Sequence, residues 1–157
     1  MDLFHKVIAT GFGSGLSPFA PGTMGALLAT LLWMAGAFTC SSSVLMTTTI
    51  VVTILFTVIG IWSSGKVEAV WGHDPSKVVV DEMVGVWIPL IICPSAATEG
   101  WYWWMLLAFV LFRFFDILKP LGIRSMEKLP SGTGIMMDDI LSGIYSLLII
   151  KLLQLIL

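Results

Sequence analysis

Long apolar segments dominate this chain and limit the folds that are open to it. Four of them approach the length of about 20 residues that a membrane-spanning helix needs, and a shorter fifth lies among them; the segments cover residues 23–40, 44–62, 83–93, 101–118 and 140–157. The chain is only 11% charged, whereas soluble domains average about 25%. The sequence therefore predicts an all-α, multi-pass transmembrane helical bundle of about four to five spans, as a single domain over residues 1–157.

The distribution of Lys and Arg predicts the topology of this bundle. Pro89 is expected to kink or shorten the helix of segment 83–93. When this segment is counted as a span, the loops that carry Lys and Arg all fall on one side, while the short loops 41–43 and 94–100 carry none. Because basic loops face the cytoplasm, we expect the N-terminus inside and the C-terminus outside. Lys151 is an exception that can snorkel to the interface.

Two adjacent pairs of acidic residues stand at the edges of apolar segments. Asp81-Glu82 precedes segment 83–93, and Asp138-Asp139 precedes segment 140–157, in a chain with only ten acidic residues. Placing two carboxylates side by side near lipid is costly unless a positive charge lies between them. A hard divalent cation such as Mg²⁺ prefers oxygen ligands. The alternative is that each pair favours a helix N-terminus through the helix dipole, but one acid suffices for that purpose.

A small residue follows each acid pair by one helical turn. Gly85 stands four residues after Asp81, and Gly143 stands four residues after Asp139. Positions four apart share one face of a helix. The small residue would therefore let another backbone or a ligand approach the carboxylates closely.

The segment before the first span, GFGSGLSPFAPGTMG at residues 11–25, is rich in glycine. Glycine lets backbone amides turn toward an anion, and the N-terminus of the following helix suits phosphate. Thr23 is expected to cap that helix. No Gly-Lys-Ser/Thr ends the segment, so it is not a P-loop; an interfacial turn in which glycine serves close packing is the alternative. The candidate anion-binding residues are Gly13, Ser14, Gly15, Pro21, Gly22 and Thr23.

A third charged group ends segment 101–118. Arg113, Asp116 and Lys119 are spaced by three residues, so neighbours in this row can touch on a helix. Arg suits planar contact with phosphate, and Lys acts as a point charge. An interfacial ladder of ion pairs is the alternative interpretation.

Composition and missing motifs exclude several classes of function. A net charge of −2 and the absence of a basic run argue against nucleic-acid binding. Neither Cys40 nor Cys93 has the Arg six residues later that a cysteine phosphatase needs, and the motifs of histidine lipid phosphatases, of haloacid-dehalogenase phosphatases and of CDP-alcohol phosphotransferases are absent. For phosphate chemistry this leaves carboxylates with a metal, and Lys or Arg to stabilise charge.

Four motifs in this chain resemble those of the phosphatidylglycerophosphatase A family. They are GFGSGLSPFAPGTMG, DPSKVVVDEMVG, FRFFDILKPLGI and GTGIMMDDILSGIYS, which begin at residues 11, 74, 112 and 132. The resemblance implies a helical bundle in the bacterial cytoplasmic (inner) membrane. It also implies Mg²⁺-dependent removal of the terminal phosphate from phosphatidylglycerophosphate, which yields phosphatidylglycerol. The acids to which the resemblance points are Asp81, Glu82, Asp116, Asp138 and Asp139.

These observations lead to one hypothesis for the site. Asp81, Glu82, Asp138 and Asp139 are expected to hold Mg²⁺ at the cytoplasmic face, with Asp116 completing the site or polarising a water. Lys119, with Arg113 and the glycine-rich amides, would neutralise the phosphate. The alternatives are a small cation transporter or channel, which would place its acids near the middle of the bilayer, and a structural subunit of a membrane complex. The sequence leaves the oligomeric state open.

Overall fold

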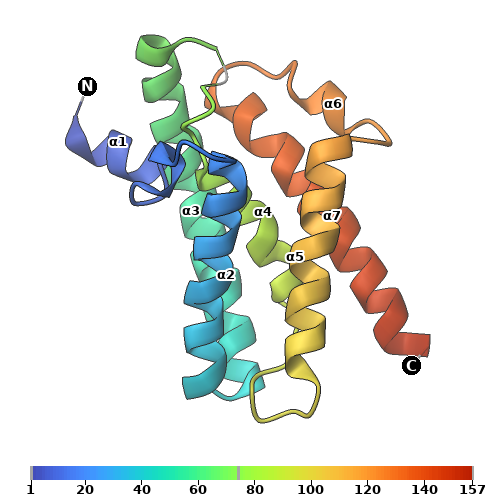
Figure 1. The fold of residues 1–157 in the computed structure, drawn as a ribbon. Helices are drawn as coiled ribbons and strands as arrows, with labels where there is room; N and C mark the ends of the chain where they lie inside the picture. The colour runs from blue at the N-terminus through green and yellow to red at the C-terminus, as the bar shows by residue number, and fades with distance from the viewer. Residues whose placement is uncertain (1, 74, 157) are drawn as a thin grey trace.

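The fold is built from helices throughout the part of the chain that the structure describes, residues 2–73 and 75–156 of a computed structural model (Figure 1). Asp74, the first residue of the second motif, lies outside that part. The elements in chain order are α1 (Leu3–Ala9), the 3₁₀-helix η1 (Ser14–Leu16), α2 (Pro21–Thr39), α3 (Ser42–Trp71), α4 (Val80–Leu90), α5 (Trp101–Leu118), α6 (Ile123–Met126) and α7 (Gly132–Ile156). The prediction of an all-α fold is confirmed.

Four helices are long and apolar enough to cross a membrane, namely α2, α3, α5 and α7. The observed bounds of α5 agree with the predicted segment 101–118, which ends just before Pro120. By contrast, α3 runs for 30 residues and continues through Lys66 and Glu68 to Trp71. The predicted apolar segment 44–62 therefore covers only part of this helix, which extends beyond its apolar residues.

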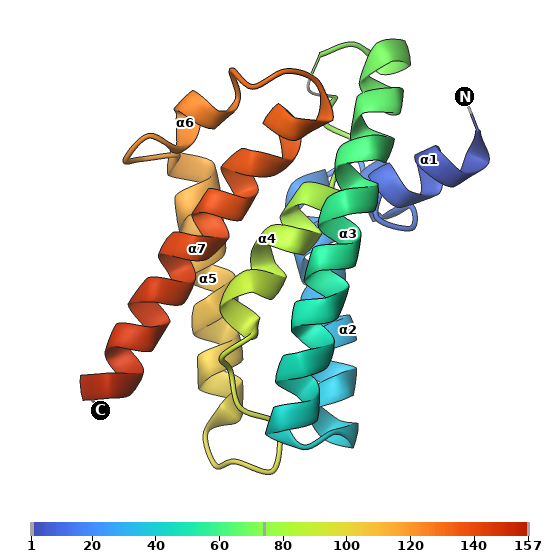
Figure 2. The ribbon, with the colours of Figure 1, turned by 180° about the vertical axis from the view of Figure 1, so that it is seen from behind.

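The third apolar segment does not form a full span of its own. Helix α4 has 11 residues, with Pro89 in its last turn. At 1.5 Å per residue it is about 16 Å long, which is roughly half of the 30 Å hydrocarbon thickness. Residues 91–100 continue without a helix to the far end of the bundle (Figure 2). Segment 83–93 therefore forms a short helix followed by an irregular segment, and four helices of the described residues are long and apolar enough to cross a membrane.

Helix α4 lies at the centre of the bundle, between α3 on one side and α5 and α7 on the other (Figure 2). Ten of its eleven residues are buried. Protein rather than lipid therefore surrounds α4 and its polar N-terminal turn, whereas residues 97–99 of the non-helical chain beyond it are exposed.

The two ends of the bundle differ in what they carry. Helices α1 and α6 and the segment between α3 and α4 lie at one end, while the α2–α3 turn and the loop before α5 lie at the other (Figures 1 and 2). The C-terminus of α7 points away from the end that carries α1. The elements that bear Lys6, Lys77, Lys119, Arg124 and Lys128 all belong to the first end.

Candidate active site

A cavity of about 360 Å³ lies at the end of the bundle that carries α1 and α6. It collects side chains from the start of α2, the start of α4, the end of α5 and the first half of α7. Most of its lining is charged, or belongs to the α2 N-terminus. The predicted site residues that line it are Pro21, Gly22, Thr23, Asp81, Glu82, Arg113, Asp116, Lys119, Asp138 and Asp139.

Three carboxylates from two helices meet in this cavity. Asp81 and Glu82 stand in the first turn of α4, and Asp139 is the eighth residue of α7. One oxygen from each lies within 4.8 Å of the others. Asp81 and Asp139 are buried. The two acid pairs, which lie 57 positions apart in the sequence, therefore contribute to a single group.

The donor set of this group fits a divalent cation. Glu82 Oε2 and Asp139 Oδ1 are buried and accept no hydrogen bond from the described part of the chain. A buried carboxylate oxygen without a partner costs free energy, and repulsion among three such groups adds to the cost. Carboxylate oxygens are the ligands that Mg²⁺ and Ca²⁺ prefer. The group therefore has the chemistry of a metal site.

Asp138 has a different partner from its neighbour Asp139. Its Oδ2 accepts a hydrogen bond of 2.6 Å from Lys119 Nζ, which also donates to Glu127 Oε1 at 2.7 Å. Burial alone would lower the pKa of Lys119, but the hydrogen bonds to Asp138 and Glu127 outweigh it and raise the pKa above its ordinary value. Lys119 therefore keeps its positive charge at the edge of the cavity. Asp138 Oδ1 stays free of hydrogen bonds from the described residues.

Arg113 and Asp116 form an ion pair one turn apart on α5, and both side chains face the cavity. Arg113 Nε is buried and has no acceptor among the described residues. The predicted contact between neighbours in the row Arg113, Asp116 and Lys119 is thus present as the ion pair of Arg113 with Asp116. Lys119 lies beyond the helix, as its C-cap in the left-handed conformation, and turns to α7 instead.

The N-terminus of α2 forms one wall of the cavity. Pro21 is its first residue, and the next amides, those of Gly22 and Thr23, have no carbonyl of their own helix to bind. The expectation that Thr23 caps this helix was wrong, because α2 begins two residues earlier and Ala20 is its N-cap. A Cβ at Gly22 would lie 2.0 Å from Glu82 Oε1. Glycine therefore lets α2 approach the carboxylates this closely while Glu82 keeps its observed position.

Three predicted residues lie outside the cavity lining. Gly13, Ser14 and Gly15 form or flank η1, and a Cβ at Gly15 would lie 2.2 Å from the carbonyl oxygen of Lys77. Gly15 thus serves close packing against the chain that leads into α4. Contact of these three residues with substrate remains a prediction.

Helix α7 begins earlier than the sequence indicated. It starts at Gly132, so that Asp138 and Asp139 are its seventh and eighth residues, and the expectation that this pair opens the helix was wrong. The capping interpretation fails for the same reason, since the dipole acts mainly within the first turn. Capping remains compatible with Asp81 and Glu82, which do stand in the first turn of α4.

The structure adds two residues with polar side chains that were not predicted for the site, one in the cavity lining and one beside it. Ser76 lines the cavity from the segment before α4. Glu127 is the second partner of Lys119. Neither residue belongs to an acid pair or a glycine-rich run, so its sequence context carries no signal of the kind that identified the others.

The fold and the cavity define a class of protein: a membrane-embedded helical bundle with a carboxylate-rich site flanked by cations at one end. The phosphatidylglycerophosphatase A family matches residues 7–154. The chain belongs to this family, and it is a phosphatase. The resemblance drawn from the four motifs is thereby confirmed.

Three relatives cover most of the chain. A protein of Bacteroides thetaiotaomicron, provisionally named a phosphatidylinositol-3-phosphatase, is 56% identical over 144 residues, which are 92% of this chain and 89% of the relative. The phosphatidylglycerophosphatase A of Haemophilus influenzae is 42% identical over 94% of this chain and 87% of its own. That of Escherichia coli is 38% identical over 89% and 77%, respectively. No solved structure matches the chain.

Proposed function

We propose that this phosphatase removes the terminal phosphate of phosphatidylglycerophosphate in a Mg²⁺-dependent reaction and so forms phosphatidylglycerol for phospholipid biosynthesis. The observation that carries the proposal is the convergence of five carboxylates, two cations and a helix N-terminus on one cavity in a chain of this family. Anionic and cationic groups at one site suit a substrate phosphate that meets both a metal and direct cationic contacts.

Asp81, Glu82 and Asp139 would hold the metal, because their oxygens lie within 4.8 Å of one another and two are without hydrogen-bond partners. When bound, Mg²⁺ supplies Lewis-acid polarisation of the phosphoryl oxygens and a more acidic water. Asp138 was also predicted as a ligand. Its hydrogen bond to Lys119 favours a second role, in which Asp138 orients the Lys119 ammonium group toward the cavity.

The remaining side chains would bind and orient the phosphate. Arg113 and Lys119 approach the cavity from the end of α5, and the amides of Gly22 and Thr23 face it from α2. Each favours the negative charge that gathers on the phosphoryl oxygens in the transition state. Asp116 holds Arg113 in place through their ion pair and offers a carboxylate for a proton of the attacking water.

The proposed location is the bacterial cytoplasmic (inner) membrane, with the cavity on the cytoplasmic side. Lys6, Lys77, Lys119, Arg124 and Lys128 belong to elements at the cavity end of the bundle, and basic loops favour the cytoplasm. A headgroup phosphate can reach this end of the bundle while its acyl chains stay in the bilayer. Labelling of a cysteine introduced at Ser76 only from the cytoplasmic side would support this orientation.

A second candidate substrate is phosphatidylinositol 3-phosphate. The observation in its favour is the name of the relative that is 56% identical to this chain. Both lipids carry a phosphomonoester on a glycerolipid, so the same carboxylates and cations could serve either reaction. They differ in the group that carries the phosphate, a small glycerol in one and a bulky inositol ring in the other.

Phosphate release from the purified protein in detergent micelles tests both candidates. We expect release from phosphatidylglycerophosphate with Mg²⁺ and none with EDTA, and a lower kcat/KM for phosphatidylinositol 3-phosphate at the same mole fraction. Asp139→Asn controls for a contaminating phosphatase. Phosphate release that survives EDTA would overturn the metal proposal. A higher kcat/KM for phosphatidylinositol 3-phosphate would make that lipid the proposed substrate in place of phosphatidylglycerophosphate.

A further inference from the structure

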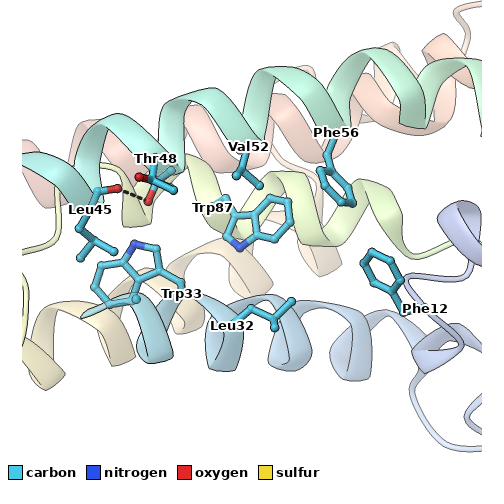
Figure 3. Close-up of a pocket in the computed structure, with 10 residues that line it drawn as sticks. Phe12, Leu32, Trp33, Leu45, Thr48, Val52, Phe56 and Trp87 are labelled. Atoms are coloured by element: carbon cyan, nitrogen blue, oxygen red, sulfur yellow. Dashed lines mark hydrogen bonds between the residues drawn. The ribbon is translucent and has the colours of Figure 1, made fainter. Parts of the chain in front are cut away.

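A second cavity, of about 260 Å³, lies between α2 and α3, away from the carboxylates. Its lining comes from the middle of α2, the first half of α3, one side chain of α4 and Phe12 from the segment that precedes α2 (Figure 3). We call this cavity the apolar slot. It is lined by Phe12, Leu32, Trp33, Gly36, Leu45, Thr48, Thr49, Val52, Phe56 and Trp87.

The chemistry of the slot suits a hydrocarbon. None of these lining residues is charged. The Thr49 hydroxyl donates to the carbonyl oxygen of Leu45 at 2.7 Å, and Trp87 Nε1 donates to the carbonyl oxygen of Ala29 at 3.0 Å. These two polar groups are satisfied within the protein, whereas Trp33 Nε1 is buried and has no acceptor among the described residues. An acyl chain that moves from the bilayer into the slot exchanges one apolar environment for another. It therefore gains only through close packing, which a slot between two helices provides.

The shape and position of the slot suit one acyl chain. Leu45 and Trp33 lie at one end and Phe12 and Phe56 at the other (Figure 3). Leu45 and Phe56 are eleven residues apart on α3, or about 16 Å at 1.5 Å per residue. One leaflet of a bilayer has about the same thickness, half of roughly 30 Å. The slot is therefore about as long as the acyl region of a single leaflet is thick, which is the length that one acyl chain spans.

The slot is open to lipid along one side and closed at its deep end. Leu32 and Phe12 are about half exposed, and Thr48 is exposed, so a chain can enter laterally between α2 and α3. Trp33 and Leu45 are both buried and close the deep end. A lipid could enter this slot from the bilayer without crossing the protein.

Two elements connect the slot to the carboxylate cavity. Trp87 stands five residues after Glu82 on α4, which is about 7–8 Å along the helix. The ring of Phe12 packs against that of Phe56, with 6.1 Å between the ring centroids. The segment that contains Phe12 continues to Pro21, which lines the carboxylate cavity. The end of the slot at Phe12 and Phe56 is thus the nearer one to the site, and its deep end, at Trp33 and Leu45, lies close to the α2–α3 turn at the far end of the bundle.

We infer that the apolar slot binds one acyl chain of the lipid whose phosphate enters the carboxylate cavity. The inference rests on the proposed function, since it supplies the second half of the same substrate. The slot makes the enzyme selective for long-chain lipid phosphates over short-chain or soluble phosphomonoesters. All of these substrates share the phosphate contacts, so the difference in binding comes from burial of the acyl chain.

A kinetic comparison tests this inference. Val52→Trp fills the slot from α3, while Val51→Trp is a matched control because Val51 faces outward with 57% of its surface exposed. We expect Val52→Trp to raise KM for dioleoyl phosphatidylglycerophosphate about tenfold, the equivalent of losing roughly two buried methylenes, and to leave dihexanoyl phosphatidylglycerophosphate unaffected. Equal effects on both lipids, or none on either, would overturn the inference. Thr48→Phe, which enters from the exposed side, replaces Val52→Trp if that variant does not fold.

Photolabelling separates this inference from the proposed reaction. In EDTA, without turnover, phosphatidylglycerophosphate with a diazirine in one acyl chain should label residues 32–36 and 48–52, and unlabelled dioleoyl substrate should compete. A phosphatidylcholine probe with the same chain should label these residues weakly. Equal labelling by both probes without competition would make the slot a site for bulk lipid and refute the inference. Labelling with competition but no phosphate release would retain the slot and reject only the reaction.

Discussion

Gly22 offers the sharpest test of the carboxylate cavity, because it brings α2 against Glu82. A Cβ built on Gly22 lies 2.0 Å from Glu82 Oε1, 2.9 Å from Glu82 Cδ and 3.5 Å from Arg113 Nη1. Ordinary contact begins near 3.4 Å. In Gly22→Ala the Glu82 oxygen must therefore move by about 1.4 Å, and a misplacement of about 1 Å in a catalytic group can cost 10²-fold in rate.

The expected result is a loss of activity without a loss of stability. We expect Gly22→Ala to lower kcat/KM by about 10²-fold, or roughly 2.7 kcal/mol in transition-state binding. The clash falls on the end of a flexible side chain, and Ala is the better helix former by up to about 1 kcal/mol. The melting temperature in detergent should therefore stay equal to that of the unmodified protein or rise.

The assay is phosphate release from phosphatidylglycerophosphate with Mg²⁺, alongside a thermal melt of the same preparation. Gly36→Ala is the matched control on the same helix, because its Cβ would meet only the end of Leu45 at 3.1 Å. Since Gly36 lines the apolar slot, this control is assayed with dihexanoyl phosphatidylglycerophosphate, whose short chains do not depend on the slot. It should retain most of the activity. Wild-type turnover in Gly22→Ala would refute the reasoning, since Glu82 would then either tolerate displacement or play no part in the reaction.

Three further predictions concern the charges of the site. Glu82→Gln and Asp139→Asn should each lower turnover by more than about 10²-fold, because residues outside the metal ligands can already cause a loss of that size. In EDTA both variants should melt at a higher temperature than the unmodified protein, since each relieves a buried unpaired oxygen worth about 1–3 kcal/mol. Mg²⁺ at about 100 times its Kd should stabilise the unmodified protein by about 2.7 kcal/mol, as measured by differential scanning fluorimetry, and should not shift Asp139→Asn. Lys119→Met should strand Asp138 and lower both turnover and the melting temperature, whereas Lys119→Arg should restore the melting temperature; equal melting of the two variants would contradict the observed ion pair.

The sequence predicted the gathering of the acidic residues at one end of the bundle better than it predicted the helix bounds. Charge in the loops was enough to bring both acid pairs, Asp116 and the start of α2 to one end of the bundle. The bounds of α3 and α7 failed because apolar composition marks the part of a helix that meets lipid, not its end. Helix α3 continues through Ser63 and Ser64, which are buried against protein, and so has no need of an apolar side chain at those positions.

The partners of individual charged residues could not be read from the sequence. Asp138 and Asp139 are neighbours of the same type, yet one binds Lys119 and the other joins Asp81 and Glu82. Successive residues on a helix point about 100° apart, so adjacent acids cannot both face one centre equally. Which of the two faces the metal group depends on how α7 is rotated against α4, and that rotation is set by packing.

The packing between α4 and α7 explains why both acid pairs are followed by a small residue. A Cβ at Gly143 would lie 2.4 Å from the carbonyl oxygen of Gly85, and a Cβ at Gly85 would lie 2.9 Å from the carbonyl oxygen of Asp139. The two helices thus touch backbone to backbone one turn beyond the carboxylates. Any larger residue at either glycine would push the helices apart and separate Asp139 from Asp81 and Glu82. The recurring pattern of acid and small residue is therefore one structural device, in which the glycines set the distance across which the carboxylates meet.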